Sequence, residues 1–91
     1  MDITIQHNPT AQRFSTSLEG HEAELIYRLH DGRMVIEHTG VPEAIGGRGV
    51  AAHLVKAALD HARAAGWKVV PACSYSAVYV ERHPEYADLL A

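Results

Sequence analysis

Three glycines within four positions make residues 46–49 the segment of this chain best suited to bind an anion. Glycine tolerates positive φ angles and lets a ligand approach the backbone N–H groups closely. An amphipathic segment begins at Val50, and the first N–H groups of a helix are unpaired and carry the positive end of its dipole. Gly46, Gly47 and Gly49 therefore predict a phosphate-binding loop. The alternative is a turn that only reverses the chain.

Two nucleotide-binding patterns match this loop in spacing but not in context. Residues 47–52 fit the dinucleotide pattern G-x-G-x-x-A, which must follow a strand directly and meet an acidic residue about twenty positions later. Residues 40–46 intervene here, and residues 71–73 downstream are Pro-Ala-Cys. Residues 46–49 also fit the G-x-x-G loop of a KH domain, which needs a helix on both sides to clamp RNA. The context disfavours both interpretations.

Cys73 is the second candidate for chemistry and the single cysteine of the chain. It lies between an expected strand and an expected helix that begins at Ser74. The positive end of a helix lowers the pKa of a nearby thiol, and the thiolate is the nucleophilic form. Alternatively, Cys73 is a small buried apolar residue, which is the usual role of a lone cysteine.

Composition describes one small domain and disfavours several classes of protein. The 91 residues are 47% hydrophobic with a formal net charge of −3, so we expect one domain over residues 1–91 and no nucleic-acid partner. One cysteine excludes an internal disulfide and fits a cytoplasmic protein. Seven histidines form no His-Glu-x-x-His pattern, so we expect no metal. We also expect no membrane span and no signal peptide in residues 1–12.

The first forty residues predict an antiparallel meander. Alternating apolar residues mark strands over residues 2–7, 22–29 and 34–39, and residues 12–18 form a second strand or continue the first. Asp31-Gly32 is the strongest hairpin signal in the chain.

The second half predicts a β-α-β-α arrangement. An apolar stripe at helical spacing marks a helix from Val50, and Gly66 is placed to end it. Residues 67–73 form a strand that should pair parallel to residues 34–39, because a helix connects the two strands. Ser74 is placed to cap a second helix, which His83-Pro84 ends. Residues 85–90 add a last helical turn or two.

This order of elements resembles the core of the Gcn5-related N-acetyltransferases. Their pyrophosphate-binding signature is Gln/Arg-x-x-Gly-x-Gly/Ala. Gly49 and Ala51 fit its second half, whereas Gly46 stands where the family prefers Gln or Arg. Flanking motifs resemble the compact, single-domain YjdJ-type subgroup: Phe14, Leu25-x-Tyr27, Asp31-Gly32-Arg33-Met34, His38-Thr39-x-Val41-Pro42, Val69-Val70-Pro71-x-Cys73-Ser74-Tyr75, Tyr79 and His83-Pro84-Glu85-Tyr86.

The resemblance implies acetyl-CoA as co-substrate. Its pantetheine arm would lie between the strand of Ile36 and the strand of Trp67, and its pyrophosphate would meet the N–H groups of residues 47–51. Arg48 could add a charge-assisted contact or be a solvated loop charge. The residues expected to contact CoA are Ile36, Gly46, Gly47, Arg48, Gly49, Val50, Ala51, Ser74 and Tyr75.

Acetyl transfer to an amine requires a base, donors for the oxyanion and an acid for the leaving thiolate. Strand alternation puts Glu37 and His38 on opposite faces, so only one can face the cleft. We favour His38 as base, because histidine titrates near neutrality; otherwise it bonds the turn at Thr39. Cys73 is the candidate nucleophile or acid. Tyr79 lies where relatives often place an acid; Tyr75 could serve instead, or both only pack.

We therefore expect an α/β (α+β) fold: an antiparallel N-terminal meander followed by a β-α-β-α core, a minimal acetyltransferase-like domain. Larger relatives carry further helices and strands around the acceptor, so we expect an open site that suits a protein or peptide amine, or one completed by a partner chain. The alternative function is a CoA-binding or acyl-CoA-binding sensor or interaction module with little turnover.

Overall fold

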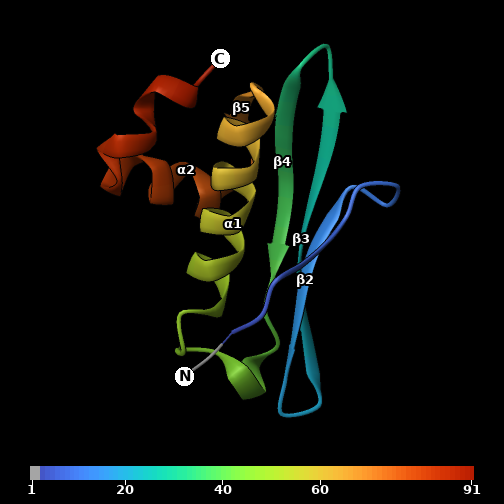
Figure 1. Cartoon of the computed structure of the whole chain (residues 1–91). Coiled ribbons are helices and arrows are strands. Elements are labelled where there is room, and N and C mark those ends of the chain that lie inside the picture. Colours follow the sequence, from blue (N-terminus) through green and yellow to red (C-terminus); the bar gives the residue numbers. More distant parts are fainter. Residues whose placement is uncertain (1–2) are drawn as a thin grey trace.

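The computed structural model describes residues 3–91, which form a five-stranded sheet. Helices α1 (Val50–Ala65) and α2 (Ser74–Arg82) lie on one side of this sheet (Figure 1). The strands lie in the order β1-β2-β3-β4-β5. The first four are antiparallel neighbours, and β4 and β5 pair parallel, as predicted. The strands are β1 (Gln6–Asn8), β2 (Arg13–Leu18), β3 (His21–His30), β4 (Arg33–Gly40) and β5 (Lys68–Pro71). The prediction of a first strand over residues 2–7 is partly wrong: β1 begins at Gln6 and includes Asn8, and Asp2 lies outside the described residues.

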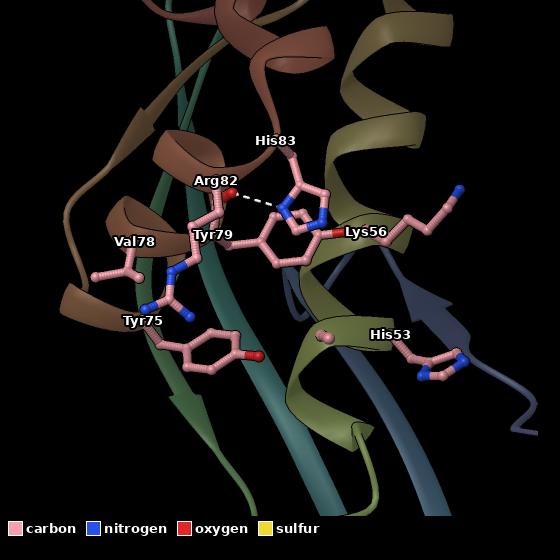
Figure 2. Close-up of a pocket in the computed structure, with 8 residues that line it drawn as sticks. His53, Lys56, Tyr75, Val78, Tyr79, Arg82 and His83 are labelled. Atoms are coloured by element: carbon pink, nitrogen blue, oxygen red, sulfur yellow. Dashed lines mark hydrogen bonds between the residues drawn. The ribbon is translucent and has the colours of Figure 1, made fainter.

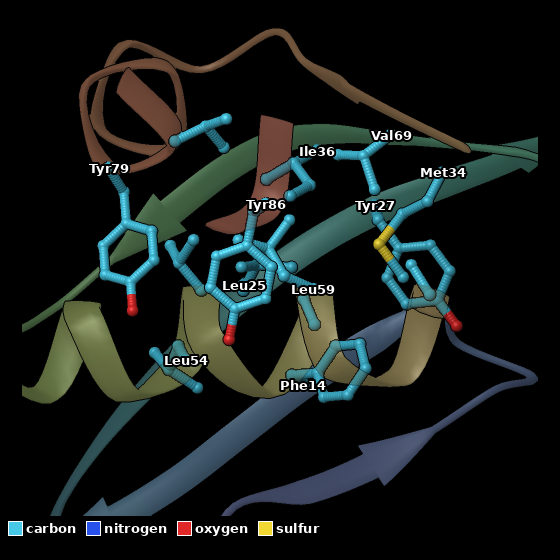
Figure 3. Close-up of a cluster of buried hydrophobic side chains, with 14 of the residues drawn as sticks. Phe14, Leu25, Tyr27, Met34, Ile36, Leu54, Leu59, Val69, Tyr79 and Tyr86 are labelled. Carbon is cyan, nitrogen blue, oxygen red and sulfur yellow. The ribbon is translucent and has the colours of Figure 1, made fainter. Parts of the chain in front are cut away.

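Helix α1 (Val50–Ala65) packs its predicted apolar stripe against the sheet. All six stripe residues are buried: Val50, Leu54, Val55, Ala58, Leu59 and Ala62. Leu54 and Leu59 of α1 belong to the same buried cluster as Leu25 and Ile36 of the sheet, and Figure 3 draws these four side chains. Gly66 ends α1 in the left-handed region, with φ +76°, as predicted.

The β3–β4 hairpin turns at Asp31-Gly32, which confirms the strongest local prediction. Both residues have positive φ angles, 51° and 75°. Positive φ at both central positions is the geometry of a type I′ turn, which matches the twist of the two strands it connects.

The prediction that Glu37 and His38 lie on opposite faces of the sheet is wrong, because a β-bulge occurs at Glu37. Tyr27 pairs with Ile36 but Ile26 pairs with His38, so Glu37 is the extra residue of β4. An inserted residue shifts the side-chain alternation by one position. Glu37 and His38 therefore lie on the same face of the sheet, the face away from α1.

The chain after β5 differs from the prediction at its boundaries. Strand β5 ends at Pro71, and helix α2 (Ser74–Arg82) is capped by Cys73 rather than Ser74. The Cys73 Sγ accepts the N–H of Ser76 at 3.4 Å. A 3₁₀ helix, η2 (Pro84–Leu89), follows at the predicted position, and Leu90 forms a parallel bridge with Val69.

Two histidines join strand β1 to α1 within an aromatic cluster. The ring of His7 stacks on Phe14 with centroids 4.1 Å apart, and His61 of α1 meets it edge-on at 4.4 Å. The His7 Nε2 lies 2.6 Å from the hydroxyl of Tyr27. Burial lowers the pKa of His7, and the nearby charge of His61 lowers it further. The folded chain therefore holds His7 neutral more firmly than the unfolded chain does.

This cluster predicts a pH-dependent stability. Because the pKa of His7 is depressed from its ordinary 6.5 in the folded state, the unfolded state binds the proton first as the pH falls. The free energy of unfolding should decrease as the pH is lowered from about 6.5 through the folded-state pKa. Urea unfolding at several pH values measures this slope, and a His7→Gln variant should show a shallower one. Equal slopes in both proteins would contradict the assignment to His7.

Candidate active site

The parallel pairing of β4 and β5 ends where the candidate site begins. Ile36 and Pro71 are the last residues in register, and the N–H of Cys73 donates to Ile36 O at 2.9 Å. Strand β4 continues to Gly40, whereas the chain after Cys73 turns into α2. The two segments therefore diverge with Cys73 at the point of separation.

Three groups converge on the Cys73 thiol. The hydroxyl of Thr39 lies 3.6 Å from Sγ, and Ser76 contributes its hydroxyl at 3.1 Å and its N–H at 3.4 Å. Burial raises the pKa of the Cys73 thiol, but the hydrogen bonds of the Ser76 side chain and backbone, of Thr39 and of the Tyr75 backbone outweigh it. The net direction is a pKa below the ordinary value, which increases the thiolate fraction at neutral pH.

Sequence reasoning missed Thr39 and Ser76. Thr39 pairs with Leu25, so it lies on the α1 side of the sheet, and only the bulge at Glu37 puts it there. A bulge leaves no dependable trace in a single sequence. Ser76 did leave a signal: a polar residue three positions after an N-cap is the spacing of a capping box, and Cys73 and Ser76 have this spacing.

The structure does not bring His38 together with Cys73. His38 pairs with Ile26, on the face opposite to Thr39, and its side chain is exposed. Its ring lies over Gly40 on that face, where an added Cβ would be only 2.8 Å from His38 Nε2. Glu37 on the same face pairs with Arg28 at 3.3 Å.

The glycine loop meets the start of α1 as predicted. Gly47 and Gly49 have φ angles of +77° and +76°, and an added Cβ at Gly47 would meet no atom within 4 Å. Gly49 is the N-cap of α1 and no side chain caps this end of the helix within residues 3–91. Gly46 is extended, with a φ of −67°. Arg48 is engaged in an ion pair with Glu19 of the β2–β3 turn.

A cavity of about 360 Å³ opens beside this loop, between α1 and α2 (Figure 2). It is lined by Ala52, His53, Lys56, Tyr75, Val78, Tyr79, Arg82 and His83. Aromatic rings and cationic groups thus share one concave surface. Tyr75 and Tyr79 lie here, whereas Cys73 is not part of this lining; Ser74 is exposed at the start of α2.

Tyr79 is buried in this cavity wall rather than hydrogen-bonded to the thiol. Its ring stacks on His83 at 3.9 Å between centroids. Burial raises the pKa of Tyr79, with a partial offset from the positive charge of Lys56. Tyr79 therefore stays protonated at neutral pH, as an acid must.

Other kinds of site find no support within residues 3–91. No three His, Cys, Asp or Glu side chains in this range form a group that could hold a metal ion. Nor does any helix in the described part of the chain have the length and apolar character of a membrane span.

Comparison with known proteins decides the family. The family model described as GCN5-related N-acetyl-transferase matches residues 13–89. The chain belongs to this family. The resemblance drawn from the sequence motifs is confirmed.

Similar proteins of this acetyltransferase family support the assignment over nearly the whole chain. Protein NATD1 of Mus musculus is 40% identical over 85 residues, covering 90% of this chain and 77% of that protein. Protein NATD1 of Homo sapiens is 39% identical over 85 residues, covering 90% and 75%. The NMR solution structure of a GCN5-like protein from Staphylococcus aureus superposes with a TM-score of 0.76 at 30% identity, covering 97% of this chain and 87% of that one. The predicted fold is confirmed.

The hydrogen bonds to Sγ predict a thiol that alkylates at unusually low pH. The rate of reaction with iodoacetamide, measured against pH, should have its midpoint below that of a free cysteine. Thr39→Val should move the midpoint up, because the variant removes a donor to the thiolate. Thr39→Ser, which keeps the hydroxyl, is the matched control and should stay near wild type. An unchanged midpoint in Thr39→Val would contradict this role of Thr39.

Proposed function

We propose that this chain transfers the acetyl group of acetyl-CoA to an exposed amine of a protein or peptide, with Cys73 as the nucleophile. Membership in the acetyltransferase family supports the choice of donor. The observation that carries the choice of nucleophile is the set of hydrogen bonds that Thr39 and Ser76 make with Sγ at the end of the parallel pairing. A cytoplasmic setting, where thiols stay reduced, is part of this proposal.

The residues around the loop fit the phosphates and the nucleoside of CoA. Gly47 and Gly49 have positive φ angles at the start of α1, where no side chain within residues 3–91 caps the helix N–H groups, which suits a pyrophosphate. The adjacent cavity offers Tyr75 for stacking against a base, and Lys56 and Arg82 for a phosphate. Lys56 Nζ pairs with Asp60 Oδ2 at 2.7 Å, whereas Arg82 has no ion pair within residues 3–91, so Arg82 is more available to a phosphate.

The first step moves the acetyl group to the enzyme. The Cys73 thiolate attacks the thioester carbonyl, the C–Sγ bond forms, the bond between the carbonyl carbon and the CoA sulfur breaks, and CoA leaves as a thiolate that takes a proton from water. One thioester replaces another, so the step needs no net energy input. Hydrogen bonds from Thr39 and Ser76 stabilise the attacking thiolate.

The second step moves the acetyl group from Cys73 to the acceptor amine without a strong base beside the thiol. An amine that arrives neutral attacks the acetyl-cysteine, an amide bond forms, and the C–Sγ bond breaks. The amine proton passes to the Cys73 sulfur or to water. No histidine or carboxylate is among the hydrogen-bond partners of Sγ in residues 3–91, and His38 lies on the other face of the sheet.

A CoA-binding module with little turnover is the second candidate function. The absence of a histidine or carboxylate among the hydrogen-bond partners of Sγ in residues 3–91 favours it, because no base beside the thiol would then deprotonate the acceptor amine. Gly46 also stands at the position where the family signature has Gln or Arg. Such a module would bind CoA but would carry no acetyl group on Cys73.

Mass spectrometry of the intact protein after incubation with acetyl-CoA tests the covalent route. We expect the added mass of one acetyl group, located on Cys73 by fragmentation and removed when an amine is supplied. Cys73→Ser, whose hydroxyl can keep the cap of α2, should lose the adduct while keeping its affinity for CoA, because the residues expected to hold the phosphates and the nucleoside are unchanged. CoA binding without any adduct would favour direct transfer or the binding module. An absence of CoA binding would overturn the proposal as a whole.

The glycine loop supplies a second test with an internal control. Gly47 and Gly32 have nearly equal φ angles, +77° and +75°, and neither has an atom within 4 Å of an added Cβ. Each Gly→Ala variant should therefore lose about 1 kcal/mol of stability through backbone strain alone. Only Gly47→Ala should also weaken CoA binding in calorimetry, because Gly32 lies in the β3–β4 hairpin. Equal CoA affinities in the two variants would show that the loop does not contact the ligand.

A further inference from the structure

We infer that His53 is a positioning residue of the acetyl-CoA site: its imidazole holds the peptide between Gly49 and Val50, and so the Val50 N–H, in the direction that a phosphate oxygen requires. This inference rests on the proposed function. It concerns a histidine that sequence analysis did not select and that the two chemical steps do not use.

The carbonyl of Gly49 accepts two hydrogen bonds from the same residue. The backbone N–H of His53 lies 3.1 Å from it, and the ring Nδ1 lies 2.8 Å from it. A carbonyl oxygen can only accept, so Nδ1 carries the proton and the tautomer is fixed. An ordinary N-cap side chain binds an N–H of the first turn, but Gly49 has no side chain to do so. The His53 ring instead restrains this end of α1 by donating a hydrogen bond to the Gly49 carbonyl.

Because the peptide between Gly49 and Val50 is planar, the hydrogen bond to the Gly49 carbonyl also restrains the direction of the Val50 N–H. In a trans peptide the C=O and the following N–H point in opposite directions, and residues 3–91 contain no cis bond. The Gly49 carbonyl points along α1 toward His53, so the Val50 N–H points out of the helix end. That N–H is the first of the helix, at the terminus where the proposed pyrophosphate would bind.

The His53 ring lies outside the buried core, so its loss should affect ligand binding more than folding. Its side chain is exposed, and Figure 2 shows it projecting from α1 away from Tyr75 and Tyr79, at the edge of the cavity lining. The buried stripe of α1 does not include it. Losing the ring should therefore leave the core intact, while the Gly49–Val50 peptide gains freedom that a bound phosphate must then remove.

Three variants separate the Nδ1 donor from the rest of the ring. His53→Ala removes the donor, His53→Asn returns an N–H near the position of Nδ1, and His53→Gln is a polar control whose amide lies one bond farther out. Calorimetry with CoA should give about five- to tenfold weaker binding for His53→Ala, the effect of one hydrogen bond. His53→Asn should bind within about twofold of wild type, and His53→Gln should resemble His53→Ala.

A donor without the phosphates and the nucleoside shows whether the effect depends on that half of CoA. S-acetylpantetheine carries the thioester but neither the pyrophosphate nor the nucleoside, so its rate of Cys73 acetylation should be the same in wild type and His53→Ala. With acetyl-CoA, His53→Ala should raise the half-saturating concentration and leave the saturating rate within about twofold. Thermal unfolding of the two proteins should differ by no more than the few degrees that one exposed hydrogen bond contributes.

The possible results separate a failure of the His53 positioning role from a failure of the proposed function. If wild type binds CoA and His53→Ala binds it equally well, the positioning role is overturned and the proposed function stands. A loss that His53→Asn does not restore, or that extends equally to S-acetylpantetheine, also overturns the role. If wild type binds no CoA, the proposed function falls, and the inference falls with it.

Discussion

The hydrogen bond from the Cys73 N–H to Ile36 O is the interaction on which the candidate site depends. It is the last backbone bond that joins β4 to the chain after β5 within residues 3–91. Beyond it, the bulge at Glu37 turns Thr39 toward the α1 side, where its hydroxyl reaches Sγ. One backbone bond and one inserted residue thus set the place of the thiol and bring Thr39 to it, while Ser76 in the first turn of α2 supplies the larger part of the hydrogen bonding that lowers its pKa.

Helix α1 connects the stability of the fold to the proposed donor site. Its buried stripe packs on the sheet, whereas its first turn and one exposed side carry the loop and the cavity wall. The C-terminal segment is held to the same helix, because Tyr86 donates to Asp60 at 2.6 Å and Arg63 contacts Asp88 at 2.8 Å. Burial of the stripe therefore fixes a helix end whose own polar groups remain free for a ligand.

Features that depend on neighbours in the sequence could be predicted, and features that depend on distant partners could not. The Asp31-Gly32 turn and the Gly66 helix end follow from local backbone preference, and the stripe of α1 follows from its period. The bulge at Glu37 depends on register with β3, and the pairing of Arg48 with Glu19 joins loops 29 positions apart. For this reason simple strand alternation wrongly placed Glu37 and His38 on opposite faces, while the fold as a whole was predicted correctly.

A structure of the chain with CoA bound would show where the thioester lies relative to the Cys73 thiol. We expect the CoA sulfur beside Cys73 Sγ, between β4 and the start of α2, with the pyrophosphate on the N–H groups of residues 47–51. The nucleoside should lie in the cavity between α1 and α2. A sulfur on the opposite face of the sheet, beside His38, would contradict the account, because the thiol could not then reach the thioester.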